Sequence, residues 1–473
     1  MRVTALSSVL MFCAANLALA ACNGGNTSPA SPPVTQARHA SGSGSSSPIQ
    51  HVVLIVQENR SFNDFFATFP GADGTTTGQA VANPNCSPPI AAGPIALTEM
   101  PLLLPQDLNH SWKTGYSVAR DGGNMDAFDL VQLGDGQYEC SYPYQYTNPE
   151  QILPYWTMAS QYALAEHMYT TQGSDSFTAH QDLIRGGTIV APNEAMVDFP
   201  GCSGGSCYWG CNAPPGTRTH LITSANVWVT KKLGPYPCSK DFKFRAKYKT
   251  LGDLLDAKSP PVSWKYYVPP SNTVNGKLLS AFRVIWPVYS GPEWTTNISS
   301  PETNIFNDIS SGQLASMSWV IPEENNSDHP GSSSDMGPQW VASVVNAIGE
   351  SQYWNSTAII IVWDDWGGFY DNMGGTLDKY GGPGERVPAI IVSPYAKAGY
   401  ISTTTYQFGS ILYYIEKNWN LGSLHTTDTG VNSIIDCFDY SQSPIPFQPI
   451  ASSLGKSYFL HEKHSYRAPD NDW

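Results

Sequence analysis

The sequence is short of charge, and basic residues are the scarcer kind. Of its 473 residues only 14% are charged, and 25 Lys and Arg stand against 39 Asp and Glu, which gives a formal net charge of -14. Proteins that bind the phosphate backbone of nucleic acids carry basic patches, so no nucleic-acid partner is expected. The chain also has no repeat of the 20–50-residue kind, which excludes a solenoid or a propeller. It does have 14 Trp, 25 Tyr and 17 Phe, enough for a large core.

The apolar run at residues 9–21 is too short for a comfortable membrane span. It follows Arg2 and ends in Leu19-Ala20-Ala21-Cys22, the spacing of a bacterial lipobox, in which the cysteine is acylated after cleavage. The run therefore predicts a lipoprotein signal peptide at 1–21 and an exported chain, tethered to the bacterial cell envelope by a lipid on Cys22. An ordinary secretory signal, with Cys22 incidental, is the alternative.

Residues 22–48 consist mainly of Gly, Ser, Pro and Thr, with almost nothing apolar. Such a composition cannot bury a core, so this segment is predicted to be a flexible linker. Residues 49–473 are then predicted to form one large domain.

The cysteines agree with export. Cys13 and Cys22 lie in the leader region, and seven remain: Cys86, Cys140, Cys202, Cys207, Cys211, Cys238 and Cys437. The close spacing of Cys202, Cys207 and Cys211 alone could suggest zinc, but disulfides in a surface loop are favoured in an oxidising compartment. Because seven is odd, one thiol is expected to be free.

Short β-branched runs alternate with helical patterns from residue 50 onward. Strands are predicted at 51–57, 316–321, 357–363 and 387–393, and helices at 150–168, 339–350 and 408–419. This order predicts an α/β layered domain with a mostly parallel sheet, and the Gly- and Pro-rich stretches near 70–105 and 194–245 are interpreted as insertions. Such a sheet collects functional groups at the carboxyl ends of its strands.

Two polar pairs stand at such strand ends. Glu58-Asn59 follows the first strand, and Asp364-Asp365 follows the run TAIIIVW. Adjacent side chains of a strand point to opposite faces, so the two aspartates can share an ion only where the chain turns, and the following Trp-Gly-Gly favours a turn. Two close carboxylates repel each other unless a cation lies between them, which makes metal binding the favoured interpretation over a solvated acidic turn. At the first pair a simple capping turn, with Ser61 capping a helix, is the alternative.

A third polar cluster, Gly173 to His180, contains Ser176. A serine in a glycine-containing turn is most often unremarkable, and no G-x-S-x-G motif indicates a lipase-type triad. On its own the cluster gives Ser176 little weight as a nucleophile.

Taken together, these segments resemble the bacterial phosphoesterase family that includes non-haemolytic phospholipases C and related acid phosphatases. The resemblance covers about residues 50–445 and is carried by HVVLIVQENRSFNDFF (51–66), DLNHSW (107–112), SFTAHQDLIRGGT (176–188), SDHPGSSSDMG (327–337), WNSTAIIIVWDDWGGFYDN (354–372), RVPAIIVSPYAKAG (386–399) and CFDYSQSP (437–444). It implies an alkaline-phosphatase-like three-layer α/β/α sandwich for the catalytic domain.

The resemblance also implies roles for single residues. Glu58 with Asn59, and Asp364 with Asp365, match the two metal-binding pairs of the family. Ser176 matches the hydroxyl nucleophile, which also contacts the metal. His110 and His329 match histidines that line the phosphate pocket; apart from the family, each would be interpreted as a packed or capping residue.

The chain departs from the family at several positions. Asn63 stands where the family commonly has Asp, Asn372 replaces a frequent His, and Tyr406-Gln407-Phe408 lacks a His often found there. The second metal pair is Asp-Asp instead of Asp-Glu, a variant associated with the phosphatase-like branch. These changes leave the metal set and the nucleophile in place and affect the expected substrate contacts.

The function predicted from these residues is metal-dependent hydrolysis of a phosphoric ester through a phosphoserine intermediate. All-oxygen ligation favours one Mg²⁺, Ca²⁺ or Mn²⁺ ion over zinc. The substrate is a phosphomonoester for an acid phosphatase or a phospholipid head group for a phospholipase C. The alternative from another class is a surface-binding lipoprotein on an inactive phosphoesterase scaffold.

Overall fold

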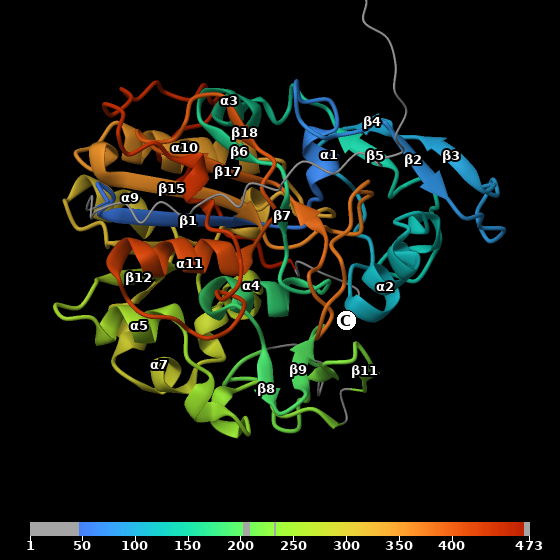
Figure 1. Cartoon of the computed structure of the whole chain (residues 1–473), viewed down its shortest axis with the longest axis horizontal. Coiled ribbons are helices and arrows are strands. Elements are labelled where there is room, and N and C mark those ends of the chain that lie inside the picture. Colours follow the sequence, from blue (N-terminus) through green and yellow to red (C-terminus); the bar gives the residue numbers. More distant parts are fainter. Residues whose placement is uncertain (1–46, 202–208, 231–232, 468–473) are drawn as a thin grey trace, which may run out of the picture. The chain divides into compact units, whose positions relative to one another are not determined.

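Eight strands form the central sheet, and all but one of them run in the same direction (Figure 1). The computed structural model describes residues 47–201, 209–230 and 233–467. Across the sheet the strands follow the order β13 (Ile298–Ser299), β12 (Trp264–Tyr267), β14 (Met317–Val320), β1 (His51–Gln57), β15 (Thr357–Trp363), β17 (Ala389–Val392), β6 (Ala163–Ala165) and β18 (Tyr400–Ser402).

The two middle strands, β1 and β15, are parallel and in register from His51 opposite Thr357 to Gln57 opposite Trp363. Nearly every residue of both strands is buried, as the apolar runs predict for a strand covered on both faces. Because the two strands start and end together, their carboxyl ends meet at one edge of the sheet. The predicted bounds of both strands are confirmed.

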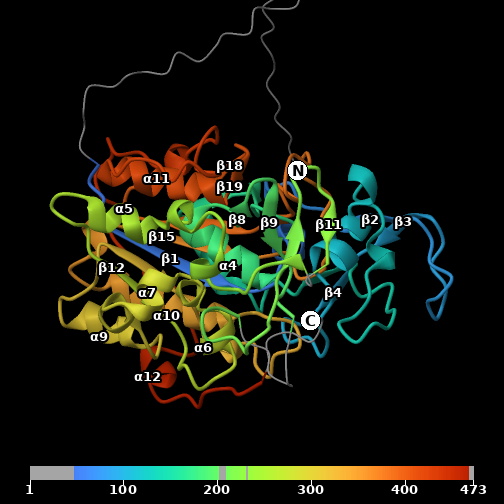
Figure 2. The same ribbon diagram turned by 90° about the horizontal axis from the view of Figure 1, so that it is seen from below.

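Helices cover both faces of the sheet. On one face α3 (Leu153–Gln161) and α9 (Asn304–Ser310) both contact α10 (Gly337–Gly349), which also packs on α12 (Lys456–Phe459). On the other face α4 (Ser176–Arg185) packs against α5 (Leu251–Ala257) and α11 (Phe408–Trp419). Figure 1 shows α3 and α10 on one side of β1 and α4, α5 and α11 on the other, and in Figure 2 β1 again lies between α11 and α10. The predicted three-layer α/β/α arrangement is confirmed.

Two sequence expectations need correction. The helix expected at 150–168 ends at Gln161, and the residues after it form β6 and β7 (Met168–Tyr169). All three residues of β6 are buried and pair with β17 and β18, so tertiary pairing overrides the helix propensity of Ala-Leu-Ala. The strand expected at 387–393 is divided at Pro388 into β16 (Arg386–Val387) and β17, and β17 is antiparallel to β15.

The insertions form smaller sheets beside the carboxyl edge. One contains β8 (Ile189–Ala191), β9 (Glu194–Val197), β10 (His220–Ile222) and β11 (Trp228–Val229); another joins β16 and β7 to β19 (Tyr406–Gln407); and two pairs are formed by β2 (Thr77–Ala80) with β3 (Gly93–Ala96) and by β4 (Thr98–Met100) with β5 (Gln145–Thr147). A second apolar cluster, with Leu108, Phe128, Tyr144 and Trp366 among its members, packs separately from the main core. It supports the loops that follow β1 and β15.

Disulfides join Cys86 to Cys140 and Cys211 to Cys238, and Cys437 is buried with a free thiol. The disulfide prediction is confirmed for these four cysteines, and the bond to Cys238 removes Cys211 from any thiolate zinc site. Cys202 and Cys207 lie outside the described residues, as do the predicted signal peptide and residues 22–46 of the predicted linker. Within the described ranges no helix is both long and apolar enough to cross a membrane.

Candidate functional site

The loops that follow β1 and β15 bring the two predicted metal pairs together. Asp364 N donates to the carbonyl of Gln57 at 2.8 Å, and Arg60 N donates to the carbonyl of Asp365 at 3.0 Å, so the strand ends stay bonded beyond the sheet. Ser61 caps the short helix α1 (Phe62–Phe66) by accepting from Asp64 N at 3.1 Å, as predicted. Glu58 and Asn59 therefore lie between two rigid elements, directly opposite the aspartates.

Each aspartate divides its two oxygens between the backbone and the site. Asp364 Oδ1 accepts from the backbone N–H groups of Asn59 and Asp365, at 3.1 and 2.8 Å. Asp365 Oδ1 accepts from Gly367 N at 2.8 Å. The turn depends on Gly367, which has a φ of +60° and whose added Cβ would lie 2.2 Å from the carbonyl oxygen of Asn59. The remaining oxygen of each aspartate is left to face the other polar groups.

Ser176 is the first residue of α4, a helix that the sequence patterns did not predict. Its Oγ donates to Glu58 Oε2 at 3.2 Å and lies 3.5 Å from Asp365 Oδ2. The residues that follow β1 and β15 thus meet the first residue of α4 at one hydroxyl, although the three segments are far apart in the sequence.

His180 belongs to the same cluster and was missed as a site residue by the sequence reasoning. It lies one helical turn after Ser176, and its Nε2 is 2.9 Å from Glu58 Oε1 and 3.5 Å from Asp364 Oδ2. The signal was present in the sequence as a serine and a histidine four residues apart, because positions i and i+4 of a helix share a face. Glu58, His180 and Asp364 present ligand atoms that all lie within 4.8 Å of one another.

Asn59 connects the two predicted phosphate-pocket histidines. Its Nδ2 lies 3.2 Å from His110 Nε2 and 3.1 Å from His329 Nε2. The Nδ1 atoms of the two rings face the carbonyls of Leu108 and Pro330, at 2.7 and 2.6 Å. A carbonyl only accepts, so each Nδ1 carries its proton and each Nε2 accepts from the Asn59 amide. Asn59 itself has a φ of +57°, a conformation that Asn adopts more readily than most residues.

Burial dominates the electrostatics of the cluster. Glu58, Asn59, His110, Ser176, Asp364 and Asp365 expose none of their surface, and His180 and His329 expose 2% each. Burial and the nearby Asp364 raise the pKa of Glu58 to about 7, against the opposing charge of His180. Burial would lower the pKa of His180, but the charges of Glu58 and Asp364 outweigh it and raise that pKa to about 10. The imidazolium of His180 thus stands between two carboxylates, where a cation is most favourable.

The donor set fits a divalent ion. Asn59 Oδ1 is buried and accepts no hydrogen bond from the part of the chain that the structure describes, because the amide nitrogen faces the histidines. An amide oxygen, three carboxylates and a hydroxyl are ligands that hard cations prefer, and His180 adds an imidazole nitrogen, which also suits Mn²⁺ or Zn²⁺.

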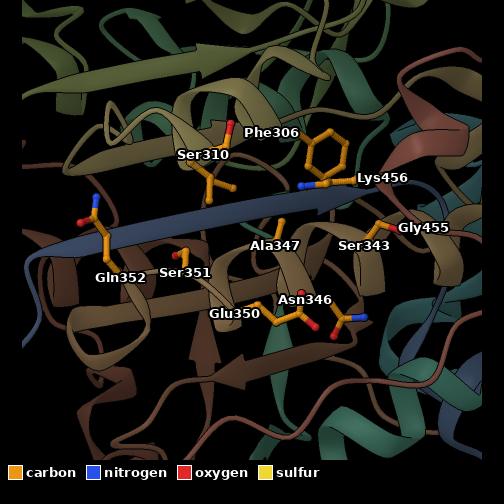
Figure 3. A pocket seen from close by; sticks show the side chains of 11 residues that line it. Phe306, Ser310, Ser343, Asn346, Ala347, Glu350, Ser351, Gln352, Gly455 and Lys456 are labelled. Atoms are coloured by element: carbon orange, nitrogen blue, oxygen red, sulfur yellow. The ribbon is translucent and has the colours of Figure 1, made fainter.

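A cavity elsewhere in the molecule lacks such groups. A cavity of about 600 Å³ lies beside α9 and α10 and is lined by Phe306, Ile309, Ser310, Ser343, Asn346, Ala347, Glu350, Ser351, Gln352, Gly455 and Lys456 (Figure 3). Among these residues there is one acid and one base, and neither histidine nor cysteine. Size alone therefore does not mark the chemical centre of this protein.

Comparison with known sequences assigns the chain to a family. The model of the Phosphoesterase family matches residues 49–422, most of the chain and all the residues of the cluster. The chain belongs to the phosphoesterase family. Members similar to it include the non-hemolytic phospholipase C of Burkholderia pseudomallei, 23% identical over 421 residues that cover 79% of this chain and 55% of that protein. Phospholipase C A of Mycobacterium tuberculosis is 25% identical over 471 residues, covering 85% of this chain and 79% of that protein.

The chain thus spans about half the length of the Burkholderia phosphoesterase. Among solved structures, a protein in the alkaline phosphatase superfamily from Vibrio parahaemolyticus is 11% identical, with a TM-score of 0.37 over 83% of this chain and 72% of that chain.

The departures from the phosphoesterase pattern fall mainly on a structural network. Asn63 bonds to Asp371 and Thr75, and Asn372 accepts from Arg386 at 2.7 Å. Arg386 also bonds to Asp371, at 3.0 Å. Asn63 and Asn372 therefore brace α1 and the loop after β15.

Proposed function

We propose that the chain is a metal-dependent phosphoric ester hydrolase in which Ser176 is the nucleophile. The observation that carries the proposal is the meeting of Ser176 Oγ with Glu58 Oε2 and Asp365 Oδ2, at 3.2 and 3.5 Å, in a fully buried cluster of metal-type donors. Membership in the phosphoesterase family supports the same reaction class.

Glu58, Asn59, Asp364 and Asp365 would hold one divalent ion, with Ser176 and His180 as further donors. When bound, such an ion supplies positive charge that lowers the pKa of the serine hydroxyl and neutralises phosphoryl oxygens. The chain's own part is to hold five oxygen donors at fixed positions on two strand ends and one helix, so that little reorganisation is needed during the reaction.

Ser176 needs a base, because a serine hydroxyl is a weak nucleophile at neutral pH. Glu58 Oε2 accepts its hydrogen bond and is placed to take the proton. The Ser176 Oγ–phosphorus bond forms while the bond from phosphorus to the leaving oxygen breaks. Water then attacks the phosphoserine, and the Oγ–phosphorus bond breaks with return of a proton to Ser176.

With Nε2 also protonated, His110 and His329 would contact the non-bridging oxygens or give a proton to the leaving group, because the neutral rings carry their proton on Nδ1. The Nε2 atoms of both rings lie next to the side-chain amide of Asn59. The two histidines therefore come close to each other although they belong to different loops. Proton transfer by a positioned group typically contributes about 10²–10⁴-fold to the rate.

The substrate is a phosphomonoester or the head group of a phospholipid. Relatives named phospholipase C favour the second, and the Asp-Asp pair after β15 favours the first. Hydrolysis of an aryl phosphomonoester and of a choline phospholipid, measured side by side across pH on residues 49–473, separates the two. Activity that disappears with a chelator and returns with Mg²⁺, Ca²⁺ or Mn²⁺ supports the proposal; inactivity on both substrates with every ion would favour the inactive scaffold.

We also propose that the chain is an exported lipoprotein acylated at Cys22. Radiolabelled palmitate in bacteria that express the full chain tests this, with Cys22→Ser as the control. Label on both forms would contradict the assignment of Cys22.

A further inference from the structure

A further buried acid lies beside the cluster and has no role in the reaction above. Asp198 follows β9, exposes 4% of its surface and has a φ of +56°. Left-handed backbone is sparsely populated by residues other than glycine and costs free energy. Favourable contacts of the Asp198 carboxylate must therefore offset both the cost of burying the acid and the cost of its backbone conformation.

Those contacts join three segments. Asp198 Oδ1 accepts from Trp112 N at 2.6 Å and lies 3.4 Å from Ser174 Oγ, while Oδ2 accepts from Trp228 Nε1 at 2.9 Å. The backbone N–H of Asp198 also donates to Ser174 Oγ, at 2.9 Å.

Two of these partners stand next to reacting groups. Trp112 is two residues after His110, and Ser174 is two residues before Ser176. Both bond to the same carboxylate oxygen, so the distance between the segment of His110 and the segment of Ser176 is set through one atom. Hydrogen bonds to a charged acceptor are stronger than those between neutral groups.

We propose that Asp198 is a positioning residue, whose carboxylate aligns His110 with Ser176 from outside the cluster. This inference rests on the proposed function. The ring of Trp228 covers the outer side of Asp198. Its centroid lies 4.6 Å from that of the His220 ring, which is tilted against it, and 4.2 Å from the Lys113 ammonium. Trp228 thus shields the bridge and is not part of it.

Asp198→Asn tests the proposal. Asn has the shape of Asp and tolerates the left-handed backbone, but its amide NH₂ replaces one carboxylate oxygen and then faces the donors that bonded to that oxygen. We expect kcat for an aryl phosphate to fall about 10²-fold, the size of effect that a misplacement near 1 Å produces, with KM changed less than about threefold. A loss confined to KM, or none at all, would overturn the proposal.

Trp228→Phe is the matched control, since it removes the outer hydrogen bond and keeps an aromatic ring; kcat should stay within about threefold of wild type. If Asp198→Asn does not fold, Ser174→Ala decides: it removes the link to the Ser176 segment alone, and an unchanged kcat would overturn the proposal.

Failure of the proposed function is recognised separately. A wild-type chain that hydrolyses no phosphoester, with every ion added, refutes the function. In that case crystal structures of the wild type and of Asp198→Asn still test the alignment. If Asp198 aligns the two segments, the distance from His110 Nε2 to Ser176 Oγ differs between the two structures; an equal distance would overturn the proposal.

Discussion

At the carboxyl ends of β1 and β15, eight polar side chains are packed so closely that none exposes more than 2% of its surface. Beside α9 and α10, a cavity of about 600 Å³ is lined by hydroxyls and amides that mostly bond to nearby backbone, such as Asn346 with Ile450 (Figure 3). The first region holds three buried carboxylates beside a single imidazolium, an excess of negative charge that a bound cation can balance. The second holds space without unbalanced charge. The contrast is the reason for proposing the first region as the active site, because burying charge without a partner is costly.

The largest expected effect separates two serines. Ser176→Ala should lower the turnover of an aryl phosphate by about 10⁴-fold or more, as loss of a nucleophile does in serine hydrolases. Ser343→Ala, which removes a hydroxyl from the cavity, should leave turnover unchanged. Steady-state assays measure the turnover of both variants, and melting temperatures check that both fold. An inactive Ser343→Ala with an active Ser176→Ala would place the active site at the cavity instead.

Metal binding should distinguish two acids in the same way. A ligand at about 100 times its Kd stabilises a folded protein by about 2.7 kcal/mol, so Mn²⁺ should raise the melting temperature of the chelator-treated protein. Asp364→Asn should abolish this rise, whereas Glu350→Gln, in the cavity, should keep it. A rise that persists in Asp364→Asn would place the ion elsewhere.

His180 gives a smaller and sharper test. His180→Gln should weaken Mn²⁺ binding about 10–100-fold in titration calorimetry, the typical cost of losing a group close to a metal. The control is His51→Gln, at the opposite end of β1, where the imidazole bonds to the Ala315 carbonyl. Tighter binding by His180→Gln would show instead that the imidazolium competes with the ion.

The smallest effect concerns Glu302, a buried acid two residues before α9. Burial, and next the nearby Glu323, raise the pKa of Glu302 to about 8, above its ordinary value of 4.5. The folded state therefore holds a proton that the unfolded chain releases, and this stabilising contribution is complete below pH 4.5 and lost as pH rises through 8. Melting temperatures from pH 5 to 8.5 should fall more steeply for wild type than for Glu302→Gln; parallel curves would contradict this assignment.

Much of the site could be predicted because its residues follow strands. The apolar runs at 51–57 and 357–363 fix where β1 and β15 end, and parallel register brings Glu58 and Asp364 to one edge. The resemblance to a family added Ser176, His110 and His329, which local patterns alone left as ordinary residues.

The missed features depend on contacts between distant segments. His180 could not be assigned because α4 was not predicted. Only in a helix does a spacing of four residues place His180 on the same face as Ser176. The residues of β6 predict a helix because Ala163 and Leu164 favour helices, but β17 and β18 pair with them and make the segment a strand. Asp198 lies in an insertion, where nothing nearby in the sequence indicates Trp112 or Ser174 as partners.

One feature of α4 has a mechanical consequence. Ser176 and His180 are carried on a single rigid segment, while Glu58 and Asp364 are fixed to the sheet, and α11 rests against that segment from outside. Any slide of α4 shifts hydroxyl and imidazole by the same amount and in the same direction. A small molecule wedged between α4 and α11 would consequently displace the proposed nucleophile and the imidazole together, without entering the cluster.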